Sequence, residues 1–226
     1  MFKRSFIYLF LACMPCYSFA QVNSIRTLSA GNYNIDSLKI LYGEHKEFIP
    51  EFELQCLLAL SYYPELKDSY ISFRYKSIGT TGKTSATTSS FLVNKNRHYI
   101  IYINSKAKGR IPLLKDVPFN GQVGLIGHEL AHVADFCNRK CLSMAAWAYS
   151  YAFKNKKADC EKATDQLTIQ HGLGWQLYDW MNFVLNQAVT TEKYKSFKKK
   201  NYLLPEEIAQ LTEAQKNSSL GRFTKN

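Results

Sequence analysis

The stretch "GLIGHELAHVAD", at positions 124–135, holds two histidines four residues apart, with a glutamate directly after the first. On an α-helix, residues four apart lie on the same face, one turn above each other. His128 and His132 can therefore direct both imidazoles at one metal ion, while Glu129 stands beside that ion and can reach a water bound to it. The stretch predicts a metal-binding helix.

The residues around this motif are uncharged and mostly apolar, as they must be on a helix that lies in the core. We expect the helix to cover roughly 121–136 and to begin at a side-chain cap from Asn120. The alternative is that the two histidines are core residues satisfied by hydrogen bonds alone.

A catalytic zinc ion needs a third protein ligand and an open fourth position. In "CEKATDQL", Glu161 and Asp165 are four residues apart on a predicted helix over 158–171. We expect Glu161 to be the third ligand and Asp165 to hydrogen-bond the far nitrogen of a ligand histidine. Asp135 is too short to reach back to the metal and is assigned a supporting or capping role. The alternative for the acidic pair is a solvated helix face.

The combination of H-E-x-x-H with E-x-x-x-D resembles the gluzincin zinc metallopeptidases, in particular the small single-domain minigluzincins. The likeness covers about residues 69–185, and Thr164 stands where alanine is commoner. It implies a zincin-like α+β fold, in which a small antiparallel sheet packs on an active-site helix and further helices. It also implies that substrate lies along the edge strand before the active-site helix, here near 99–104.

The same resemblance implies a mechanism. One catalytic Zn²⁺ would be held by His128, His132 and Glu161, and Glu129 would act as the general base in the hydrolysis of a peptide or protein substrate. Such enzymes add a side chain that stabilises the oxyanion. Four residues near the motif are candidates for that role, with packing as the alternative for each: Tyr149, Tyr151, His171 and Tyr178.

A non-catalytic function remains open beside the peptidase. The same zinc site would also suit a zinc-stabilised binding module that has lost hydrolytic activity. The near-match "SIGTTGKT" to a phosphate-binding loop carries little weight, because a strand and not a helix is expected after it.

The first 20 residues predict a signal peptide. Lys3 and Arg4 precede an apolar run that is too short to span a bilayer, and 18–20 form a plausible cleavage site. We expect an exported protein, periplasmic or extracellular, with a single domain over 21–226. A lipid anchor at Cys13 is not expected, because its surroundings fit a lipoprotein signal poorly.

Four cysteines remain after removal of the signal peptide. In an oxidising compartment disulfides are expected, with three possible pairings. The four residues are Cys56, Cys137, Cys141 and Cys160.

The charge is strongly positive. Loss of Lys3 and Arg4 lowers the net charge from +11 to +9, and much of the excess lies in "KYKSFKKKN", at 193–201. We interpret this segment as a solvated helix face or tail, with attraction to anionic surfaces or acidic substrates as the alternative. Neither nucleic-acid binding nor stable membrane insertion is expected, and the sequence does not indicate an oligomeric state.

The other elements complete an α+β order within one domain. A helical region, a strand, a Gly/Ser/Thr loop and a hairpin come first. Helices over 141–154 and 175–188 and a short terminal helix from Pro205 follow. The helical region covers 36–63 and the strand 69–76, while the loop covers 77–90 and the hairpin 90–104.

Overall fold

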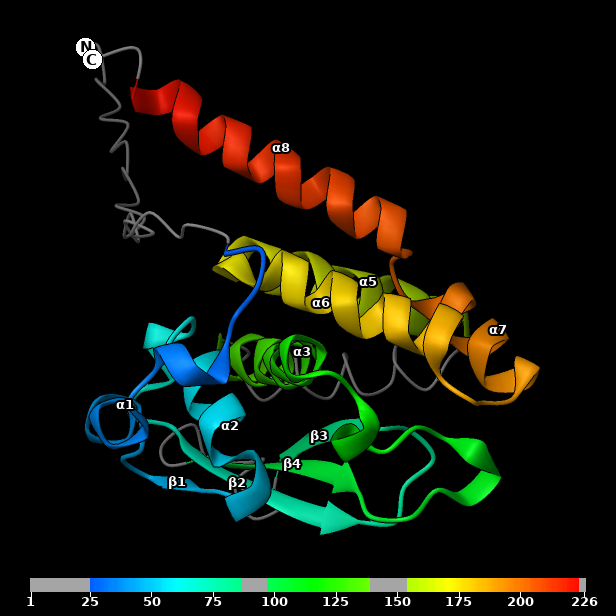
Figure 1. Cartoon of the computed structure of the whole chain (residues 1–226), viewed down its shortest axis with the longest axis horizontal. Coiled ribbons are helices and arrows are strands. Elements are labelled where there is room, and N and C mark those ends of the chain that lie inside the picture. The colour runs from blue at the N-terminus through cyan, green and yellow to red at the C-terminus, as the bar shows by residue number, and fades with distance from the viewer. Residues whose placement is uncertain (1–24, 87–96, 139–153, 224–226) are drawn as a thin grey trace, which may run out of the picture.

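The computed structural model describes residues 25–86, 97–138 and 154–223. The fold is α+β. Figure 1 shows a small sheet, α3 above it, α5 and α6 above α3, and α8 outermost on α6. Within the described residues, none of the helices combines the length and apolar character needed to cross a membrane.

The described elements have the following bounds. The α-helices are α1 (Ile35–Tyr42), α2 (Glu53–Leu60), α3 (Phe119–Asn138), α5 (Lys154–Thr168), α6 (Gly174–Asn182), α7 (Glu192–Asn201) and α8 (Pro205–Phe223). The strands are β1 (Lys46–Glu47), β2 (Tyr70–Lys76), β3 (Gly82–Ala86) and β4 (His98–Asn104).

The sheet has the order β1-β2-β4-β3 and is mixed, so the predicted antiparallel sheet is wrong. β2 runs parallel to both β1 and β4, and only β3 is antiparallel to its neighbour. The chain leaves β2, forms β3 at the far side, and returns to place β4 between them. Parallel pairing of β2 with β4 follows from this crossover.

The strand expected to bind substrate is not an edge strand. β4, which contains 99–104, is paired on both sides, by β2 and by β3. β3 forms one edge of the described sheet, with β1 at the other, and it lies in a segment that was expected to be a loop. Thr84 of β3 pairs with Ile101 of β4, and threonine favours strands through its branched Cβ. β3 lies against α3.

The expected helical region over 36–63 is divided. α1 ends at Gly43, His45 adopts a positive φ of 59°, and the short β1 follows. Pro50, which lacks a backbone N–H, begins a 3-10 turn before α2. The predicted helical region therefore consists of two short helices, α1 and α2, separated by the turn at Gly43–His45, the strand β1 and the turn at Pro50.

α3 is the central helix, and it is buried over nearly its whole length. It begins at Phe119, so the predicted cap at Asn120 is wrong. Asn120 is instead buried inside the first turn, where its Oδ1 accepts from the backbone N–H of Leu28 and from Gln176 Nε2. The amide thus fastens the beginning of the described chain to the centre of the fold.

A break separates α5 from α6, as expected from the gap between the predicted helices over 158–171 and 175–188. α5 ends at Thr168, and a π-helical turn over Ile169–Leu173 follows, in which Gly172 has a φ of 89°. Only glycine takes this backbone conformation without strain. The last helix, α8, has 19 residues and is not short as predicted.

Some predictions lie outside the described residues: the signal peptide, the helix over 141–154 with Tyr149 in it, and the first arm of the hairpin. The core extends beyond 69–185, since one buried apolar cluster includes residues from Leu28 to Ile208. Among the described residues no disulfide joins Cys56, Cys137 and Cys160, and Cys141 lies outside them.

The α3–α6 contact gives a stability prediction. A Cβ at Gly124 would collide with the backbone carbonyl of Gln176, which has no flexible end to move away. We expect Gly124→Ala to lower the free energy of unfolding by about 3 kcal/mol, the upper range for overpacking, and Tm by about 5–10 °C. Thermal unfolding followed by circular dichroism measures this. Gly79→Ala, with no atom near the added Cβ, should change Tm little; equal losses in both variants would contradict the packing argument.

Candidate metal centre

Three side chains meet in the core where α3 and α5 pack together. Nε2 of His128 and Nε2 of His132 lie 3.3 Å and 3.4 Å from Oε2 of Glu161. All three residues are buried, with Glu161 only 2% exposed. Ligand atoms about 2.0–2.1 Å from a tetrahedral metal ion lie about 3.4 Å from one another. The two distances therefore match the spacing of ligands around one such ion.

One face of α5 supplies both the third ligand and the support for the histidines. Asp165 Oδ1 lies 2.8 Å from Nδ1 of His128. Thr164 Oγ1 donates to the carbonyl of Cys160 and lies 3.3 Å from Nδ1 of His132, from which it can accept. Both Nδ1 atoms are thereby assigned protons, and both Nε2 atoms are left for a metal ion.

The chain after α7 completes this support. The backbone N–H of Leu203 donates to the second oxygen of Asp165, at 2.9 Å, so the buried carboxylate is held on both sides. Beside it, the ring of Tyr202 packs against His128, with 5.6 Å between ring centroids. Sequence reasoning missed both Thr164, which it treated as a minor departure, and Tyr202. Thr164 could have been found from its spacing, because it lies three residues after Glu161 and so on the same face of the helix.

The acidic neighbours control protonation in the metal-free protein. Burial alone would lower the pKa of His128, but hydrogen bonds to Asp165 and Glu161 and their negative charges outweigh it and raise that pKa to about 10. Burial would raise the pKa of Glu161, but hydrogen bonds from His128 and His132 hold it well below its usual range. A proton on His128 therefore occupies the position that a cation would take.

Glu129 points to the sheet side of α3 and is not part of the metal-binding group. Glu129 is 4% exposed, and its carboxylate accepts a hydrogen bond from Oγ1 of Thr84, on β3, at 2.7 Å. Gly82, also on β3, leaves room for it, because a Cβ there would lie 2.9 Å from Oε1 of Glu129. An edge strand of the described sheet thus orients this glutamate.

The predicted oxyanion residues have other partners. His171 uses both ring nitrogens, Nδ1 with the carbonyl of Leu167 and Nε2 with Glu65, and it stacks on Tyr63. Tyr178 packs between Arg26 and Trp175.

Tyr149 and Tyr151 lie outside the described residues. Asp135 is half-buried on α3 and does not join the metal-binding group.

Comparison of the chain with protein-family models, with curated proteins and with solved structures finds no match. The site is therefore interpreted from its own residues. Two carboxylates and two neutral imidazoles carry two negative charges, from Glu161 and Asp165, which a divalent cation would balance. The buried group of His128, His132 and Glu161 could hold a metal ion.

The contact between Asp165 and His128 predicts a loss of metal affinity. Asp165→Asn should weaken zinc binding by about 10–100-fold, because the amide no longer fixes the tautomer or raises the basicity of His128. A zinc titration against a competing chelator measures the affinity. Asp159→Asn, at an exposed position of the same helix, is the matched control and should bind zinc as the wild type does. Equal affinities in both variants would contradict the supporting role.

Protonation of the site predicts proton release on metal binding. With the pKa of His128 raised to about 10, the metal-free protein carries this proton at pH 7, and a cation must displace it. We expect at least one proton, that of His128, to be released per zinc ion at pH 7, and ionisation of a zinc-bound water would add to it. The part of this release that comes from His128 should halve near pH 10, where half of its imidazole is already neutral in the metal-free protein. Calorimetric titrations in buffers of different ionisation enthalpy measure this number, and heats independent of the buffer at pH 7 would refute it.

Proposed function

We propose that the chain is a zinc metallopeptidase with a zincin-like fold that hydrolyses peptide bonds. His128, His132 and Glu161 would hold one Zn²⁺, and Glu129 would be the general base. The observation that carries the proposal is a buried glutamate that belongs to the motif but not to the metal-binding group.

The composition of the site favours catalysis over a purely structural role. Structural zinc sites are closed by four protein ligands, whereas catalytic ones have three and an open position. The described residues supply three. A structural site also has no use for a further buried carboxylate such as Glu129, held at 2.7 Å by Thr84. In the proposed reaction that carboxylate is oriented before substrate arrives.

Each side chain of the site has a defined task in this reaction. A bound zinc ion supplies a water of lowered pKa and polarises the substrate carbonyl. Glu129 accepts the proton of the attacking water and delivers it to the leaving amine. Thr84 holds the Glu129 carboxylate by a hydrogen bond, while Asp165 and Thr164 keep the two imidazoles in the tautomer that presents Nε2.

Substrate would bind along β3 by strand addition. β3 forms one edge of the described sheet and touches Glu129 through Thr84 and Gly82. A peptide paired with β3 would therefore pass next to the general base. Tyr202, which packs on His128, replaces His171 and Tyr178 as the aromatic side chain proposed to face the oxyanion. The basic first residues and the apolar run after them support export to a periplasmic or extracellular location.

The proposal predicts that metal binding and hydrolysis can be separated. Glu129→Gln should keep one zinc ion per chain and lower the rate of hydrolysis of unfolded casein by about 100-fold or more, because the amide cannot accept the proton. Metal analysis and a casein assay measure both. Glu213→Gln, at an exposed position of α8, should keep full activity. Zinc without cleavage in either form would favour the non-catalytic binding module, and absence of zinc would contradict both functions.

A further inference from the structure

One lysine of the basic segment 193–201 is buried. Lys193, Lys199 and Lys200 are exposed on α7, as expected for a solvated helix face, but Lys198 is only 3% exposed. In the part of the chain that the structure describes, the ammonium group has no hydrogen bond or ion pair to an oxygen atom. An ammonium group on a buried side chain without an anionic partner calls for an explanation.

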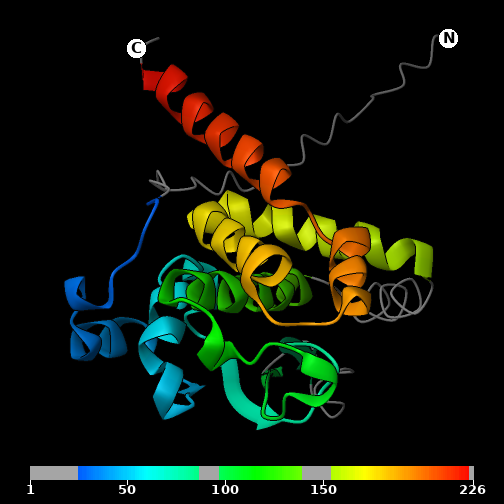
Figure 2. The same cartoon turned by 45° about the vertical axis from the view of Figure 1, so that its right-hand side comes forward.

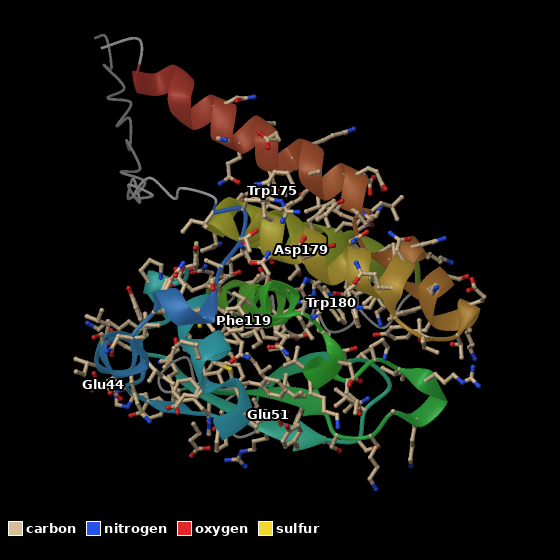
Figure 3. All side chains as sticks on the ribbon, viewed as in Figure 1. Glu44, Glu51, Phe119, Trp175, Asp179 and Trp180 are labelled. Carbon is tan, nitrogen blue, oxygen red and sulfur yellow. The ribbon has the colours of Figure 1, made fainter. Side chains whose placement is uncertain are left out.

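Aromatic rings surround this ammonium group. Nζ of Lys198 lies 3.8 Å from the ring centroid of Tyr202, 5.5 Å from that of Trp180 and 5.8 Å from that of Tyr194. Figure 3 shows Trp180 where α6 passes α3. The ring faces attract a cation, but they leave the N–H groups without acceptors. We call these four residues the Lys198 cage.

The Lys198 cage lies between the metal-binding group and the beginning of β3. Tyr202 packs on the His128 ring as well as on Lys198. The hydroxyl of Tyr194 lies 3.3 Å from Oγ1 of Thr81, the residue directly before β3. Figure 2 shows α7 following α6, close to α5. A peptide placed along β3 and over the metal would therefore have one of its ends near the cage.

We propose that the Lys198 cage is a subsite for a carboxylate of the substrate, so that the enzyme prefers acidic peptides. This inference rests on the proposed peptidase function. The carboxylate would accept hydrogen bonds from the ammonium group of Lys198 and supply the anionic partner that the protein does not. Tyr202 would couple the subsite to the metal, since its ring touches both Lys198 and His128.

Two sources of this carboxylate are chemically equivalent. A substrate strand antiparallel to β3 would direct its carboxyl end toward the beginning of β3, where the α-carboxylate of a short peptide would reach Lys198. The side chain of an aspartate or glutamate in a longer peptide would present the same group. Thr84, which contacts Glu129, lies three residues after Thr81, which contacts Tyr194 of the cage, so about three extended residues of a peptide paired with β3 would lead from the general base to the cage.

The test uses matched peptides. Bonds cleaved in unfolded casein are mapped by mass spectrometry, and one cleaved segment is synthesised as two pairs. One pair ends three residues after the scissile bond, as the free acid or the amide. The other pair is longer and amidated, with a glutamate or a glutamine two residues after that bond. We expect at least one charged peptide to have a kcat/KM about tenfold above its neutral counterpart, mainly through KM.

The two pairs identify the source of the carboxylate. Preference for the free acid assigns the subsite to the α-carboxylate, and preference for the glutamate peptide assigns it to a side chain. Equal values within both pairs would overturn the proposal. These comparisons use the wild-type protein, so they do not depend on the folding of any variant.

Substitutions then connect the preference to Lys198. Lys198→Met keeps the apolar stem, and we expect it to abolish the preference, measured as the ratio of kcat/KM between the charged peptide and its neutral counterpart. Lys198→Arg should keep the preference, as should Lys199→Met, the exposed neighbour. Circular dichroism and zinc content verify that each variant is folded. A preference that survives in folded Lys198→Met would refute the assignment.

Binding without turnover separates this inference from the peptidase proposal. Zinc-loaded Glu129→Gln is titrated calorimetrically with N-acetylated alanine–leucine hexapeptides that differ only in a C-terminal acid or amide, or an internal glutamate or glutamine. Charged peptides should bind about tenfold more tightly. Tighter binding of the charged peptides, in a protein whose wild type does not cleave casein, would contradict the peptidase function and leave the carboxylate subsite standing. Cleavage without charge preference in either assay would contradict the subsite alone.

Discussion

The polar contact between α3 and α5 is the constraint on which the structure depends. It places two carboxylates, Glu161 at 2% and Asp165 at 0% exposure, in the centre of a helical layer. Each is tolerated only because an imidazole of α3 lies against it. Breaking a buried pair of this kind costs about 3–5 kcal/mol, because the other charge is left without a partner. The position of α5 on α3 is therefore set by charge as much as by shape.

This contact also determines where the neighbouring segments lie. Asp165 uses its second oxygen on the backbone N–H of Leu203, so the chain after α7 must return to α5. That return brings Tyr202 onto His128 and, with it, the Lys198 cage next to the metal-binding group. A single carboxylate thus connects the ligands, the aromatic ring beside them and the buried ammonium.

The sequence predicted the parts of this site that depend on helical spacing. His128, His132, Glu161 and Asp165 are each specified by an interval of four residues on a helix, and the interval survives in any tertiary context. β3 was missed because its residues form a strand through pairing with β4 and packing on α3, which no local pattern encodes.

The buried state of Lys198 was missed for the same reason. Its neighbours in the sequence are lysines, and its aromatic partner Trp180 comes from another helix. Contacts between distant segments also decided the mixed order of the sheet and the role of Asn120.

Two different parts of the fold orient the side chains of the candidate site, and this difference favours a catalytic site over a structural one. The metal-binding group belongs entirely to α3 and α5, while Glu129, adjacent to His128 in the chain, is oriented by β3. A helix turns by about 100° per residue, so consecutive residues must face different neighbours. A structural metal site would need only the helical side. In the proposed peptidase, orientation of Glu129 by β3 would hold its carboxylate where substrate and metal meet, which is the requirement of a general base.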